Sequence, residues 1–139
     1  MPLDPPLTAD TKAWLAKATS DLRAAGHALT ARPPLFSDSA FHCQQVAEKA
    51  MKGFLAWHNV PFRRVHSLEE IGEQCLQIEP ELRQILDRAV PPTEYAWKFR
   101  YPGEADEPTA TEAQDALATA HAVYQAVLSS LPRDVHPLS

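Results

Sequence analysis

The stretch FHCQQVAEKAMKGFLAWHN, residues 41–59, repeats apolar and small side chains every three or four positions. This spacing is typical of an amphipathic helix with one buried face, and it predicts a helix over residues 39–58. The side chains expected on the buried face are Ala40, Cys43, Ala47, Ala50, Met51 and Phe54.

A polar face remains on the same helix, formed by Gln45, Glu48, Lys49 and Lys52. Glu48 precedes Lys52 by four residues, the orientation that favours an ion pair on a helix surface, worth roughly a few tenths of a kcal/mol. Two interpretations follow. The face is either solvated and stabilised by that pair, or it offers an amide and two ammonium groups to a ligand or a partner.

Prolines separate further segments with helical periodicity, and no segment has the alternating pattern of a strand. The other predicted helices cover residues 9–31, 67–77, 80–89, 93–100 and 109–131. Capping boxes of Ser67 with Glu70 and of Thr109 with Glu112 mark two of the starts. Pro80 suits a first helical position, where its missing N–H is not needed.

These segments predict an all-α protein, folded as an antiparallel up-and-down bundle of four to five helices. A length of 139 residues suits one domain with a core of its own. The domain is expected to cover residues 9–131, with loose termini at 1–8 and 132–139.

Charge is unevenly distributed along this acidic chain, whose formal net charge of −5 argues against sequence-independent binding to duplex nucleic acid. No carboxylate occurs between Glu48 and Glu69. The basic and imidazole side chains in that interval are Lys49, Lys52, His58, Arg63, Arg64 and His66. The interval is therefore a candidate site for an anionic ligand. The competing interpretation is a solvated basic turn.

Other site classes have no signature in this chain. Cys43 and Cys75 form no close-spaced pair, which favours two reduced, buried thiols. The histidines lack metal-ligand spacing and glycine-rich phosphate loops are absent, so we expect neither a metal nor a cofactor. The N-terminus lacks the features of a signal peptide, and no apolar run approaches a membrane span. We therefore expect a cytoplasmic protein without a membrane partner.

Several motifs resemble one family when they are taken in order. The pattern W...A..DL..A begins at Trp14, and F..QQ.AEKA.K..L runs from Phe41 to Leu55. H.L follows at His66, then RYP at 100–102, and an alanine-rich helix closes the chain. This arrangement resembles the HEPN domain (higher eukaryote and prokaryote nucleotide-binding), a family of small helical bundles.

The resemblance implies a function as well as a fold. HEPN proteins are often dimers, and many are encoded beside a minimal nucleotidyltransferase with which they form toxin–antitoxin or two-component modules. Active members are metal-independent ribonucleases that use an arginine and, after four to six intervening residues, a histidine. The arginine would stabilise phosphate charge and the histidine would carry protons. By this resemblance, Arg100 is the candidate phosphate-facing arginine.

The chain departs from the ribonuclease motif after Arg100. The positions where the histidine would stand hold Ala105, Asp106 and Glu107. We therefore favour a non-catalytic nucleotide-binding or interaction module. The side chains expected to bind its nucleotide or RNA ligand are those of Gln45, Lys49, Lys52, Arg63, Arg64, His66 and Arg100.

Two alternatives stay open. In the first alternative, the chain is a metal-independent ribonuclease with an altered site, in which Arg100 contacts phosphate and His66 or Tyr101 carries the proton. In the second alternative, the chain is a structural dimer without a ligand. For Arg100 itself, the alternative to a phosphate contact is that it closes the bundle by pairing with an acid such as Glu48.

Overall fold

The computed structural model describes residues 5–62, 68–89 and 107–137, and in this part of the chain all regular structure is helical. The α-helices are α1 (Pro5–Thr30), α2 (Phe36–Trp57), α3 (Leu68–Ile78) and α5 (Ala110–Ser129). Two short 3-10 helices are η1 (Pro80–Leu82), which leads into a helical segment at 83–89, and η2 (Arg133–Val135). The predicted all-α helical bundle is confirmed.

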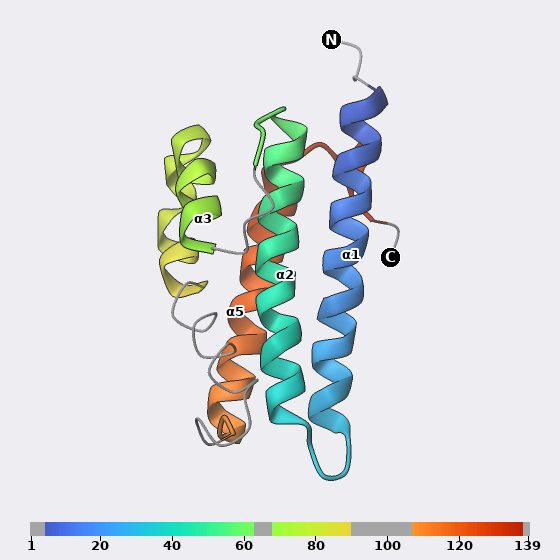
Figure 1. The fold of residues 1–139 in the computed structure, drawn as a ribbon, viewed down its shortest axis with the longest axis vertical. Helices are drawn as coiled ribbons and strands as arrows, with labels where there is room; N and C mark the ends of the chain where they lie inside the picture. Colours follow the sequence, from blue (N-terminus) through green and yellow to red (C-terminus); the bar gives the residue numbers. More distant parts are fainter. Residues whose placement is uncertain (1–4, 63–67, 90–106, 138–139) are drawn as a thin grey trace.

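The long helices α1, α2 and α5 lie side by side (Figure 1). The connection at 31–35 turns the chain back, so α2 runs antiparallel to α1, and α5 runs alongside in the direction of α2. The helix α3 packs on α2 at a side away from α1. As a result α2 occupies the middle of the bundle, with neighbours on three sides.

The central position of α2 decides which of its side chains are buried. All six side chains expected on its apolar face are buried, as are Val46 and Leu55. Two members of the expected polar face are buried as well, since Glu48 is 3% exposed and Lys52 is 6% exposed. The interpretation of a solvated face is therefore wrong for this pair, because the sequence pattern does not reveal how many neighbours a helix has.

Local signals mark several helix ends. Thr109 Oγ1 accepts from the backbone N–H of Glu112 at 3.1 Å and the Glu112 carboxylate accepts from the N–H of Thr109 at 2.9 Å, so the predicted capping box of α5 is confirmed. Pro80 stands at the start of η1, as expected. The helix α2 ends with Asn59 in the left-handed region at φ 55°, and the N–H of Val60 bonds to a carbonyl one turn back, the arrangement of a Schellman motif.

Some boundaries differ from the expectation. The helix α1 begins at Pro5, inside the segment expected to be loose. The closing residues 132–137 also pack on the bundle, because Val135 is fully buried and the His136 ring bonds to carbonyls of Leu128 and Leu131 at 2.7 and 3.1 Å. The predicted helix at 93–100 and the Ser67 cap lie outside the described residues.

Close contact between α1 and α2 depends on Gly53. A Cβ atom there would lie 3.2 Å from Leu15 Cδ2 and 3.3 Å from Trp14 Cβ. Ser39 Oγ also donates to the carbonyl of Ala25 at 2.9 Å from within the core. These contacts fix which turn of α1 faces which turn of α2.

Candidate functional site

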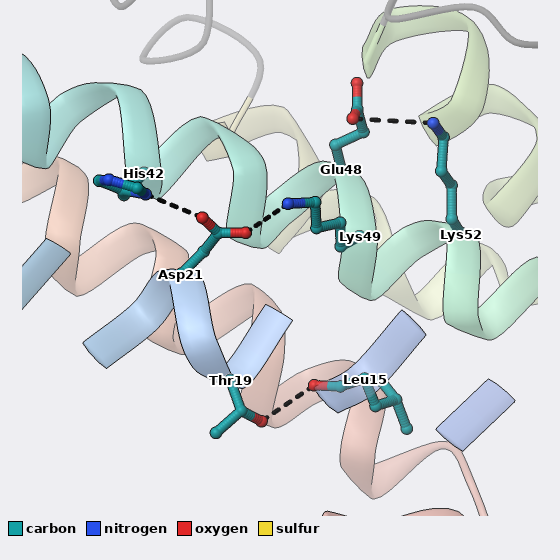
Figure 2. Close-up of polar contacts among 7 residues, drawn as sticks. All are labelled: Leu15, Thr19, Asp21, His42, Glu48, Lys49 and Lys52. Atoms are coloured by element: carbon teal, nitrogen blue, oxygen red, sulfur yellow. Dashed lines mark hydrogen bonds and ion pairs between the residues drawn. The ribbon is translucent and has the colours of Figure 1, made fainter. Parts of the chain in front are cut away.

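A group of charged side chains lies along the seam between α1 and α2 (Figure 2). Asp21 of α1 points between two side chains of α2, where its Oδ1 is 2.8 Å from His42 Nδ1 and its Oδ2 is 2.6 Å from Lys49 Nζ. The side chains are 13% exposed for Asp21, 32% for His42 and 22% for Lys49. One carboxylate therefore holds two donors at the edge of the solvent.

The helical repeat explains why His42 and Lys49 share this carboxylate. They stand seven residues apart, which is close to two full turns, so both lie on the face of α2 that packs against α1. An ionised carboxylate only accepts hydrogen bonds, so the Nδ1 atom of His42 carries the proton in this contact. In the neutral form of the ring, the second nitrogen, Nε2, is then the acceptor.

Lys52 lies deeper, next to aromatic rings. Its ammonium nitrogen is 3.7 Å from Glu48 Oε2, 5.2 Å from the centre of the Trp14 ring and 5.7 Å from that of Phe62. The Trp14 and Phe62 rings meet edge to face at 5.7 Å and 68°. Buried charges need such compensation, and the ion pair and the two ring faces both supply it.

The second cation near Trp14 is Lys17, whose nitrogen is 5.5 Å from the ring centre. Lys17 is exposed, in contrast to the buried Lys52. Trp14 is half-buried and therefore belongs to the surface seam more than to the core, whereas the neighbouring Leu15 is fully buried.

The described part of the chain contains three of the predicted site residues, Gln45, Lys49 and Lys52, all on α2. Gln45 and Lys49 are half-buried, whereas Lys52 is buried. The other candidates lie outside the described residues: Arg63, Arg64, His66, Arg100 and Tyr101. Their roles stay predictions.

Sequence reasoning missed the side chains that give this seam its charge pattern. The candidates did not include the charged or imidazole side chains of Lys17, Asp21 and His42, nor the ring of Phe62 beside Lys52. The seven-residue spacing of His42 and Lys49 indicates a shared face, but nothing in the spacing indicates that Asp21 lies opposite them. That contact depends on the packing of two helices.

Two buried thiols and one small cavity also lie within the described residues. Cys43 and Cys75 are free and buried, and burial raises the pKa of each to about 12, with a bond from Ser39 opposing the shift at Cys43. A cavity of about 10 Å³, room for one water molecule, is lined by Cys43, Gln44, Ala47, Ala89, Ala116, Thr119 and Ala120. It is too small for a nucleotide.

Residues 5–62, 68–89 and 107–137 contain neither a metal-binding cluster nor a helix that could span a membrane. No three His, Cys, Asp or Glu side chains gather there as a metal site requires. Over the same ranges, every helix is too short or too polar to cross a bilayer.

Comparison with known proteins bears on the whole bundle. The family model described as HEPN domain matches residues 11–131, which is most of the chain. No curated protein and no solved structure matches it. The match spans α1 through α5, including both helices of the charged seam. The chain therefore belongs to the HEPN family, whose domains serve in general as nucleotide-binding or ribonuclease-like modules.

Proposed function

We propose that this chain is a HEPN module that binds a nucleotide and a protein partner and has no ribonuclease activity of its own. In this proposal a single bundle of residues 9–131 forms a homodimer in the cytoplasm. Its partner is a minimal nucleotidyltransferase, and the two proteins make up a toxin–antitoxin-type or two-component system.

The observation that carries this proposal is the state of the two α2 lysines. Lys49 is paired with Asp21 at 2.6 Å, and Lys52 is buried beside Glu48. Catalysis of phosphate chemistry needs cations directed at the charge that develops on the phosphate. Lysines that are already neutralised by carboxylates of the same bundle do not supply this charge, which argues against catalysis by Lys49 and Lys52 and leaves nucleotide binding to other side chains.

The sequence after Arg100 supports the same conclusion. Ala105, Asp106 and Glu107 occupy the positions of the ribonuclease histidine. Glu107 is exposed, and its Oε1 accepts a hydrogen bond from Ser37 Oγ at 3.4 Å. A carboxylate at the position expected for the proton-carrying histidine repels an RNA phosphate and so does not assist its cleavage.

Three measurements test the proposal. Light scattering on the purified protein is expected to give twice the chain mass of 15.4 kDa. Calorimetry is expected to detect binding of a nucleotide to the protein. We also expect a complex when the chain is co-expressed with a nucleotidyltransferase encoded by a neighbouring gene. A monomer that binds neither would contradict the proposal, and a dimer that binds neither would favour the purely structural alternative.

The second candidate function is a metal-independent ribonuclease, and one contact favours it. The Asp21 carboxylate holds the His42 ring by Nδ1, and in the neutral form of the ring Nε2 is an acceptor, an arrangement that suits proton transfer. Arg100 would supply the phosphate contact, with His66 or Tyr101 as the other proton carriers.

Cleavage of tRNA without metal decides this alternative. A ribonuclease is expected to lose its activity in Arg100→Ala, and also in His42→Ala if the Asp21–His42 pair carries the proton. Absence of cleavage by the wild type, or equal rates in wild type and Arg100→Ala, would remove the ribonuclease.

A further inference from the structure

The indole ring of Trp14 has two ammonium groups near it that differ in exposure. Lys52 lies 5.2 Å from the ring centre and is buried, so its position is fixed by packing. Lys17 lies 5.5 Å from the same ring and is exposed. One cation is therefore part of the bundle, whereas the other rests on the ring from the solvent side of α1.

The charge of Lys17 has no carboxylate partner in the described part of the chain. Asp21 follows it by four residues and is the neighbour that a helix would offer to a lysine. Both oxygens of Asp21 are taken, however, one by His42 and the other by Lys49. Because α2 binds this carboxylate, the ammonium of Lys17 is available to an anion from outside.

The indole itself is held firmly. The Cβ atom of Trp14 lies against Gly53, since a Cβ added to Gly53 would be 3.3 Å from it. The Trp14 ring meets the Phe62 ring edge to face. A rigid aromatic side chain loses little freedom when a planar ligand stacks on it, which favours affinity. Every base can stack on such a ring, and a purine covers the indole most fully because both are fused two-ring systems. A nearby cation adds attraction for the backbone phosphate.

We propose that Trp14 and Lys17 form a nucleotide-binding position on α1, in which a purine ring stacks on the indole and the Lys17 ammonium pairs with the phosphate. Lys17 leaves the ring face when the base arrives. This position rests on the proposed nucleotide-binding function and assigns it to residues outside the expected α2 lysines. The shared chemistry is a purine carrying a 5′-phosphate, whether free or at the end of an RNA strand.

The experiment is a calorimetric titration of the full chain with AMP, with ATP and with a 5′-phosphorylated oligoadenylate. Trp14→Leu is expected to weaken binding about 5- to 150-fold, the range found when a stacking ring is removed. Lys17→Gln is expected to weaken it about three- to tenfold and to reduce its salt dependence. The matched control is Lys12→Gln on the same helix, which removes an exposed lysine at another angle and is expected to change affinity less than twofold.

A fluorescence readout separates binding from folding. Nucleotide is expected to quench Trp14 emission, so the quench persists in Trp57→Phe and disappears in Trp14→Phe. Trp14→Phe keeps an aromatic ring, and its affinity is expected to stay within about fivefold of the wild type. This variant keeps the test meaningful if Trp14→Leu fails to fold.

The outcomes distinguish the two proposals. If the wild type binds nucleotide and the Trp14 and Lys17 variants match Lys12→Gln, this position is wrong and nucleotide binding itself stands. If the wild type binds none of the three probes, both the position and nucleotide binding are overturned. Tight binding of AMP or ATP identifies a free nucleotide as the source, and binding of the oligoadenylate alone identifies RNA.

Discussion

Replacing Lys52 by methionine tests the most unexpected feature of α2, its buried ion pair. The substitution removes the ammonium and keeps an unbranched, helix-forming side chain. The side chains of Lys52 and Glu48 are 7% and 4% exposed. Removing one partner of a buried pair leaves the other charge in a poorly solvating interior, which costs about 3–5 kcal/mol.

We expect the lower end of that range, about 3 kcal/mol. The separation of Lys52 Nζ and Glu48 Oε2 is a long 3.7 Å, and Glu48 has a further interaction besides Lys52, so its charge keeps some compensation. The contacts of the ammonium with the Trp14 and Phe62 rings are lost as well. On a solvated helix surface, the same pair would contribute only roughly a few tenths of a kcal/mol.

Urea and thermal unfolding separate these two magnitudes. A loss of about 3 kcal/mol lowers the melting temperature of a domain this size by roughly 10 °C. Lys12→Met is the control, because Lys12 is exposed on α1 and its replacement is expected to stay within about 0.5 kcal/mol of the wild type. If Lys52→Met is no less stable than Lys12→Met, the buried pair does not have the energetic role assigned to it.

The double variant Glu48→Gln with Lys52→Met extends the test. It removes both charges, so it is expected to be more stable than Lys52→Met alone. A double variant that is less stable by the sum of the two single losses would show that the two side chains act independently.

Three further predictions concern packing and chemistry elsewhere in the bundle. Gly26→Ala is expected to stabilise the fold by about 0.5–1 kcal/mol, since no atom lies within 4 Å of the added Cβ. Gly53→Ala is expected to destabilise it by about 1 kcal/mol, because the added Cβ crowds α1. Equal urea midpoints for the two variants would contradict this. Cys43 and Cys75, with each pKa raised to about 12 by burial, are expected to react with Ellman's reagent at pH 8 only after unfolding, and rapid labelling of native protein would refute it. His136→Ala is expected to cost about 1 kcal/mol in thermal unfolding, because the ring no longer donates to the carbonyls of Leu128, in the last turn of α5, and Leu131, just beyond it. An unchanged melting temperature would exclude that role.

The sequence predicted the helices of this bundle because their signals are local. Apolar spacing located α2, and the Thr109–Glu112 pair located the start of α5 to the residue. Spacing alone did not reveal that α2 has helices on three sides, since one apolar stripe is compatible with one neighbour or with several. The i,i+4 pair of Glu48 and Lys52 was therefore found correctly and placed wrongly, at the surface instead of the interior.

The seam between α1 and α2 was beyond prediction for a different reason. His42 and Lys49 share a face by helical geometry, but their partner Asp21 is 21 and 28 positions away along the chain. The meeting depends on the register between the helices, which the contacts of Gly53 fix. A change of register by one turn would bring other side chains opposite them, and no motif within α2 excludes it.

This register also decides which cation is available to a ligand. Counted along the chain, the basic side chains after Glu48 look uncompensated, because no carboxylate follows until Glu69. In space, Lys49 has the carboxylate of Asp21, which the helical spacing of α1 would otherwise give to Lys17. The choice of Asp21 between these two lysines moves the available positive charge from α2 to α1, beside the ring of Trp14. The charge balance of this helix surface is therefore a property of helix packing, and a count of charges along the sequence misplaces it.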